Sequence, residues 1–191
     1  MIVLKNIVVF IVDDFINIVY NNRVINKKLS NVIDKGFIVN KSNFIEEFIK
    51  LSKKEKIKTK LFGEIITIVK NSFYSISDVA FIENIFNELG FLKVDYLDIK
   101  ELFSLEDATF IEINNSYMVI NFDIGLYFDL DYFKDIPRIL DYFSLFIKED
   151  LILFGTNKNI PKINVKNKKV YYYDNFENYI AESLLRVKKC D

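Results

Sequence analysis

The sequence contains no histidine, only one cysteine, and few of the residues that interrupt regular structure. Without histidine, the Ser-His-Asp and Cys-His nucleophiles and every histidine-containing zinc site are excluded. An enzyme of this sequence would have to use carboxylates, lysine, tyrosine or a bound metal. The single cysteine, Cys190, cannot form a disulfide within the chain, which is typical of a reducing compartment. We therefore expect a cytoplasmic protein.

An excess of either charge and a long apolar segment are also missing. The 26 basic and 27 acidic residues leave a net charge of -1, whereas proteins that bind nucleic acid usually show a basic excess. The apolar run at residues 7–12 is too short to span a membrane, and no cleavage site of a signal peptide follows it. Hydrophobic residues make up 51% of the 191 residues, enough for a core without disulfides. We expect a globular protein without a nucleic-acid partner.

The first half of the sequence alternates between strands and helices. An Asn-Asn pair at positions 21 and 22 predicts a tight turn between two strands, and Gly90 predicts the end of a helix. Asn43 and Glu46 have the spacing of a capping box at the start of another helix. The predicted strands are residues 6–13, 15–20, 23–28, 64–70 and 91–97, and the predicted helices are residues 44–56, 78–89 and 99–103.

The second half repeats this order of elements. Asp135 predicts the cap of a helix with Pro137 in its first turn, where proline is tolerated. In place of a helix between the last two strands, only a short turn near residues 159–163 is predicted. The predicted strands are residues 109–113, 116–122, 126–133, 151–154 and 169–173, and the predicted helices are residues 136–147 and 175–187.

Both halves thus show three strands followed by alternating helices and strands. The pattern predicts an α/β protein with two βββαβαβα subdomains, residues 1–105 and 106–191, each with a mixed sheet. This order resembles that of the actin-like ATPase superfamily, in which two RNase-H-like halves enclose a nucleotide cleft. The likeness is greatest to the bacterial FtsA and PilM branch and to the cytoplasmic domain of GspL.

The phosphate-binding loops of that superfamily are degraded in this sequence. The first reads roughly Asp-x-Gly-Thr/Ser and follows the first strand, where this chain has Asp13 and Asp14 but neither glycine nor hydroxyl. In the second loop Glu112 takes the place of the acid, and no glycine follows. A backbone that holds phosphate through its N–H groups usually needs glycine for close approach. The resemblance therefore implies that phosphate binding is lost.

The adenosine-binding motif of the superfamily is better preserved. A strand running into Gly155 and Thr156 resembles it, with one glycine kept, and residues 179–185 resemble the terminal helix. The resemblance therefore implies a vestigial, inactive nucleotide cleft, without bound cofactor, at Asp13, Asp14, Glu112, Gly155 and Thr156. We predict no catalytic residue and no metal site.

The leading hypothesis is a non-catalytic scaffold in a pilus, secretion or division assembly at the inner face of the membrane. Its partner would be a protein, such as the cytoplasmic tail of a membrane protein, and we also consider a homo-oligomer. The residues leave two other classes open. A metal-dependent phosphotransferase or nuclease would use Asp13, Glu112, Asp129 and Asp131, the last two on one strand face. A nucleotide-binding switch would keep a working cleft near Gly155.

Overall fold

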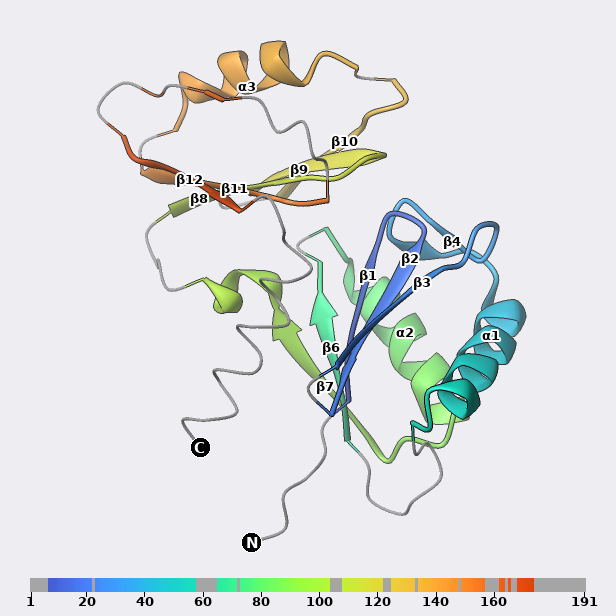
Figure 1. The fold of residues 1–191 in the computed structure, drawn as a ribbon. Coiled ribbons are helices and arrows are strands. Elements are labelled where there is room, and N and C mark those ends of the chain that lie inside the picture. Colours follow the sequence, from blue (N-terminus) through green and yellow to red (C-terminus); the bar gives the residue numbers. More distant parts are fainter. Residues whose placement is uncertain are drawn as a thin grey trace, which may run out of the picture. The chain divides into compact units, whose positions relative to one another are not determined.

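The computed structural model describes residues 7–21, 23–57, 65–71, 73–103, 108–121, 125–132, 134–147, 149–156, 162–163, 165 and 168–173. The chain divides into two compact units, residues 1–99 and residues 100–191 (Figure 1). Each unit contains a five-stranded sheet. Among the described residues, no helix combines the length and the apolar character needed to cross a membrane.

The sheet of the first unit has the strand order β3-β2-β1-β6-β7. Its strands are β1 (Ile7–Val12), β2 (Phe15–Tyr20), β3 (Arg23–Lys28), β6 (Ile65–Lys70) and β7 (Lys93–Asp98). β1, β2 and β3 form an antiparallel meander, and β6 and β7 run parallel to β1. Every residue of β1 is buried, as expected for a central strand with a continuous apolar sequence.

Two helices, α1 (Lys41–Lys54) and α2 (Ile76–Glu88), lie on one face of this sheet (Figure 1). They meet through aromatic side chains, because the ring of Phe86 on α2 packs edge-on against those of Phe44 at 6.0 Å and Phe48 at 5.4 Å. All three side chains are fully buried. Burial of each contributes about 1.5–3 kcal/mol, so this cluster holds both helices on the sheet.

The helix starts show one wrong prediction and one missed cap. α1 begins after Asn40, whose side chain accepts the N–H of Asn43 at 3.1 Å, so the predicted cap at Asn43 lies inside the helix. α2 begins after Ser75, which forms a reciprocal capping box with Asp78. Gly90 has a φ of 92° directly after the C-terminal cap, which confirms the predicted helix end.

A short hairpin between β3 and α1 was not predicted. It consists of β4 (Ile33–Asp34) and β5 (Phe37–Ile38), joined by Lys35 and Gly36, which both have positive φ. Strands of two residues are too short to show an alternating pattern, so periodicity could not reveal them.

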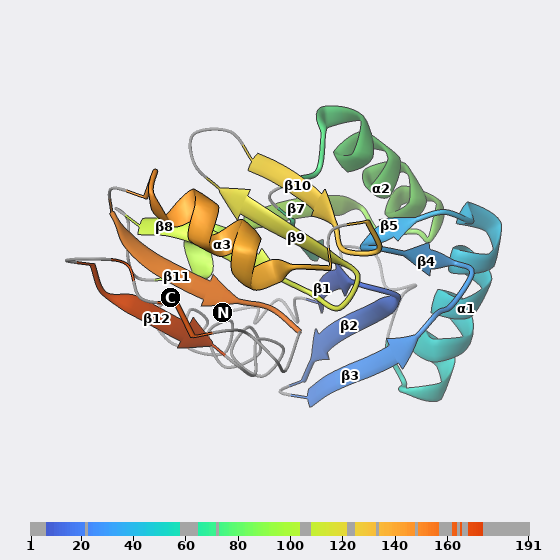
Figure 2. The same cartoon turned by 90° about the horizontal axis from the view of Figure 1, so that it is seen from above.

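The sheet of the second unit repeats the first in order and direction (Figure 2). Its order is β10-β9-β8-β11-β12, where β8, β9 and β10 form the antiparallel meander and β11 and β12 run parallel to β8. The strands are β8 (Ala108–Ile113), β9 (Tyr117–Asn121), β10 (Gly125–Asp129), β11 (Asp150–Phe154) and β12 (Val170–Tyr173). The predicted duplication with mixed sheets is thereby confirmed.

The 3-10 turn η1 (Ile99–Leu102) precedes the second sheet, and α3 (Ile136–Ser144) lies over one face of that sheet (Figure 2). Asp135 caps α3, as predicted, by accepting the N–H of Arg138 at 3.3 Å. The helix ends at Ser144 and not at residue 147. Between β11 and β12 the described residues, 155–156, 162–163, 165 and 168–169, are not helical. The predicted closing helix at residues 175–187 lies outside the described residues.

Candidate functional site

The acidic pair of the first unit forms the whole turn between β1 and β2. Val12 pairs with Phe15 in the sheet, so only Asp13 and Asp14 connect the strands. Asp13 has a φ of 53°, a conformation that aspartate tolerates better than most residues. The carbonyl of Asp13 accepts the N–H of Gly36 at 2.7 Å, and that of Asp14 accepts the N–H of Leu29 at 2.8 Å. The turn is therefore fastened to the segment that carries the β4–β5 hairpin.

The two carboxylates lie in different environments. Asp13 is buried, with 5% of its surface exposed. The Oδ2 atom of Asp14 accepts the hydroxyl of Ser30 at 3.1 Å and pairs with Nζ of Lys28, also at 3.1 Å. More than half of the Lys28 side chain is exposed, so this ion pair contributes at most about 1 kcal/mol. Asp14 thus stabilises the turn through this hydrogen bond and this ion pair.

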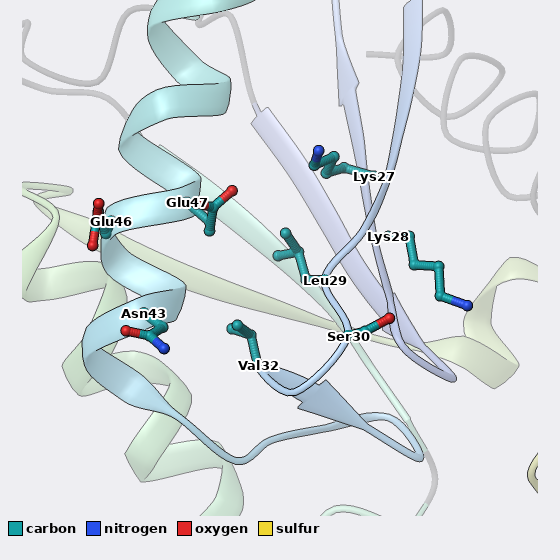
Figure 3. A pocket seen from close by; sticks show the side chains of 8 residues that line it. All are labelled: Lys27, Lys28, Leu29, Ser30, Val32, Asn43, Glu46 and Glu47. Atoms are coloured by element: carbon teal, nitrogen blue, oxygen red, sulfur yellow. The ribbon is translucent and has the colours of Figure 1, made fainter.

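A polar groove lies beside Asp14, between the end of β3 and α1 (Figure 3). Its volume is about 370 Å³, and its lining is Lys27, Lys28, Leu29, Ser30, Val32, Asn43, Glu46 and Glu47. Lys50 pairs with Glu46 at 2.7 Å and with Glu47 at 3.0 Å. The hydrogen bond and the charge of Lys50 lower the pKa of Glu46. The groove therefore presents charges of both signs to solvent.

The second unit contains a buried network of polar side chains at the end of β8. Glu112 is fully buried, and its Oε1 atom accepts Nδ2 of Asn114 at 2.6 Å and the hydroxyl of Tyr117 at 3.1 Å. Oδ1 of Asn114 accepts the backbone N–H of Thr156 at 3.0 Å and its hydroxyl at 3.2 Å. The network ties the β8–β9 turn to the residues that follow β11.

Gly155 lets these two segments approach each other. It has a φ of 142°, and a Cβ atom at this position would lie 1.9 Å from the carbonyl oxygen of Ile113. A residue with a Cβ atom cannot approach the backbone of Ile113 so closely. The glycine retained in the adenosine-like motif thus has a structural reason, because it places Thr156 within reach of Asn114.

The structure distributes the five predicted site residues between the units. Glu112, Gly155 and Thr156 come together in the second unit, whereas Asp13 and Asp14 form the turn of the first. Their role as a vestigial nucleotide site stays a prediction. Sequence reasoning missed Asn114 as the residue that joins Glu112 to Thr156, although its position in a predicted turn marked it as a polar side chain near Glu112.

A second missed residue, Asn71, follows β6 at the place that Gly155 takes after β11. Its Nδ2 atom donates to the carbonyl of Ile11 on β1 at 2.9 Å, while its buried Oδ1 atom has no hydrogen-bond partner among the residues that the structure describes. An unpaired buried amide oxygen costs about 1–3 kcal/mol. In both units, then, the residue that follows the fourth strand of the five-stranded sheet contacts the end of the central strand.

The predicted pairing of Asp129 and Asp131 on one strand face is wrong. β10 ends at Asp129, and Asp131 lies in the turn that follows, where its N–H donates to Oδ1 of Asp129 at 3.0 Å. Asp129 thereby stabilises the turn. Within the described part of the chain, no three Asp, Glu, Cys or His residues gather closely enough to hold a metal ion.

Two sheets of identical order and direction, one in each half, define the fold class. The fold is that of the actin-like ATPases, as the similar solved structures show. No family model matches the sequence, and no curated protein matches it.

The solved structures that resemble this chain are distant relatives in sequence. The ethanolamine utilization protein EutJ from Carboxydothermus hydrogenoformans has a TM-score of 0.59 at 11% identity, over 93% of this chain and 87% of its own. The apo ParM protein of psk41 has a TM-score of 0.52 at 9% identity, over 97% and 99%. MreB5 of Spiroplasma citri bound to ADP has a TM-score of 0.51 at 8% identity, over 72% and 56%.

This chain therefore spans little more than half the length of MreB5. At such low identities the likeness shows the fold alone. The predicted likeness to the FtsA and PilM branch and to GspL stays a prediction.

Proposed function

We propose that this protein is a non-catalytic actin-like scaffold that binds a protein partner and has lost tight nucleotide binding. The resemblance of its element order to FtsA, PilM and GspL supports a place in a membrane-associated assembly, such as a pilus, secretion or division machine.

The main observation is that both hydrogen-bond donors of Thr156, the second residue after β11, are already used inside the second unit. Both the N–H and the hydroxyl of Thr156 donate to Oδ1 of Asn114, and Nδ2 of Asn114 donates to Glu112. A phosphate group is bound by donors of this kind, from backbone and side chains. Here a phosphate would have to displace Asn114 and would meet the buried acidic side chain of Glu112.

The turn of the first unit supports the same proposal. Phosphate-binding loops present several successive N–H groups around a concave surface, and glycine provides the necessary conformations. The β1–β2 turn has two residues, both acidic, and its carbonyl groups bind the N–H groups of Leu29 and Gly36. Such a turn repels an anion and does not form the concave surface of N–H groups that binds phosphate.

The test is ligand binding by calorimetry and by thermal unfolding in three solutions: buffer, magnesium chloride, and magnesium chloride with ATP. A ligand at a hundred times its dissociation constant stabilises the folded state by about 2.7 kcal/mol, which raises the unfolding midpoint by several degrees. The scaffold proposal expects no shift at millimolar concentrations of either ligand.

The other outcomes point to the alternatives. A shift with magnesium ATP but not with magnesium alone would replace the proposal with a nucleotide-binding switch, an alternative favoured by the ADP held in the similar MreB5 structure. Loss of that shift in the variant Thr156→Val would place the nucleotide at the network. A shift with magnesium alone would favour a carboxylate-based phosphotransferase or nuclease.

A further inference from the structure

The duplicated fold contains the same groove twice, with opposite character. In each unit it lies between the outer strand of the meander and the helix that follows that strand in sequence. The groove of the first unit is lined mainly by charged and polar side chains (Figure 3). The groove of the second unit has a volume of about 400 Å³ and is lined by Phe128, Tyr132, Lys134, Asp135, Arg138, Ile139, Tyr142 and Phe143. The polar groove of the first unit can therefore serve as the control for experiments on the aromatic groove of the second unit.

Large aromatic side chains are exposed along this second groove. Tyr132 is 83% exposed, Tyr142 is 59% exposed, and Phe146, one turn further along the chain, is 55% exposed. The ring of Tyr142 lies 5.2 Å from that of Phe143 and 5.6 Å from that of Phe146, and Phe143 lies 5.6 Å from Phe128 of β10, so these four rings form a continuous cluster. Aromatic clusters of this kind are typical of protein-binding surfaces.

The outer strand of the first sheet is basic, whereas the outer strand of the second sheet carries no cation. β3 carries Arg23, Lys27 and Lys28, and cations on an outer strand prevent the addition of a further strand. β10 has the sequence GLYFD without a cation, and Leu126 and Tyr127 are 38% and 37% exposed. In the described part of the chain, β9 is the neighbour of β10, and β10 ends the sheet. β10 is therefore the outer strand suited to pairing with another chain.

The charges of the groove favour an acidic group in the bound segment. Lys134 and Arg138 contribute two cations to the lining, while the carboxylate of Asp135 caps α3. Asp131 and Asp141 are close to these residues in sequence but do not line the groove. An acidic side chain beside Arg138 suits the groove itself.

We propose that β10 and α3 bind an extended segment of a partner protein. The segment adds to β10 as a further strand, inserts alternate large apolar side chains between β10 and α3, and places an acidic side chain beside Arg138. Main-chain pairing supplies affinity in this mode, and the alternate side chains supply specificity. The inference rests on the proposed scaffold function, since it identifies the surface that holds the partner.

The first experiment selects binders without assuming their sequence. A phage-displayed library of random peptides is panned against the immobilised full chain, and the enriched peptides are synthesised and titrated by fluorescence polarisation. We expect peptides in which large apolar residues alternate with polar ones and an acidic residue is present. Leu126→Lys, which gives β10 the protection of β3, is expected to weaken binding at least about tenfold.

The matched control is Val24→Lys. Val24 lies on β3 and is 41% exposed, close to the 38% of Leu126, so this variant adds the same charge to the other sheet. It is expected to leave binding unchanged. Arg138→Glu is expected to weaken the binding of the selected acidic peptides about tenfold. The same variant is expected to bind peptides whose acidic residue is replaced by lysine more tightly than the unchanged protein does. A purely structural role of Arg138 would not produce this reversal.

Several results would overturn the inference. These are the absence of enriched peptides, equal effects of Leu126→Lys and Val24→Lys, self-association in ultracentrifugation that Leu126→Lys abolishes, and sedimentation with phosphatidylglycerol vesicles that Tyr142→Ser abolishes. The last two would assign the surface to a second copy or to a membrane. Nucleotide binding is measured separately, so a working cleft would refute the proposed loss of nucleotide and leave the peptide result intact.

Discussion

Replacing Gly155 with alanine tests the close contact between β8 and the end of β11. The added Cβ would lie 1.9 Å from the carbonyl oxygen of Ile113, and a φ of 142° is strained for any residue with a side chain. Such backbone strain costs about 1–3 kcal/mol, and overpacking against rigid backbone costs a similar amount. We therefore expect Gly155→Ala to lower the free energy of unfolding of the second unit by about 3 kcal/mol.

The assay is urea unfolding followed by tyrosine fluorescence, combined with hydrogen exchange measured by mass spectrometry. Exchange is expected to increase in β8 and β11 and to stay unchanged in β1 and β2, because these strands belong to the other unit. The control is Gly125→Ala, since Gly125 is exposed and lies outside the positive-φ region. If the free energies of unfolding of both variants lie within about 0.5 kcal/mol of each other, a Cβ at position 155 does not clash with the carbonyl of Ile113.

Three further predictions concern a cap, the buried network and alkaline pH. Asn40→Ala should lower the free energy of unfolding by about 1 kcal/mol, whereas Asn43→Ala should have almost no effect; equal losses in a urea titration would contradict the cap at Asn40. Glu112→Ala removes the acceptor of two buried hydrogen bonds and should cost about 3 kcal/mol, with Glu112→Gln costing less, as urea titration of both variants would check. Burial, and secondarily the charge of Glu83, raises the pKa of Tyr96 to about 12. Between the ordinary value of 10.0 and this one, the unfolded chain loses the phenolic proton first, so stability is full below that window and falls as pH rises through it. Tyr96→Phe should remove one phenolate step near pH 12 from the absorbance titration, and an unchanged titration would refute the assignment.

The order of elements could be predicted from the sequence because each sheet contains a strand with a continuous apolar run. All residues of β1 and residues Leu151 to Phe154 of β11 are buried and apolar, so the buried strand is visible as an apolar run in the sequence. Scarce glycines added reliable boundaries, as Gly90 shows with its positive φ. The duplicated order therefore predicted the actin-like fold.

The exact ends of helices and strands were harder to predict, because several polar residues near each end could form the cap or the turn. Asn40 and Asn43 both suit a helix start, and the structure selects Asn40. Asp129 and Asp131 have the spacing of a shared strand face, but the chain turns after Asp129. In each case a side-chain hydrogen bond marks the boundary, since Asn40 accepts the N–H of Asn43 and Asp129 accepts the N–H of Asp131.

The sequence by itself determined the strands of the two five-stranded sheets, the helices that cover them, and the loss of glycine from both phosphate-loop positions. Only the tertiary structure decided which side chains meet. Asn114 and Thr156 are 42 residues apart, and the parallel pairing of β8 with β11 brings them into contact. The contrast between the polar groove of the first unit and the aromatic groove of the second likewise arises only when strand and helix are packed together. Local pattern specifies elements, whereas contacts between distant residues depend on the register and packing of the whole sheet.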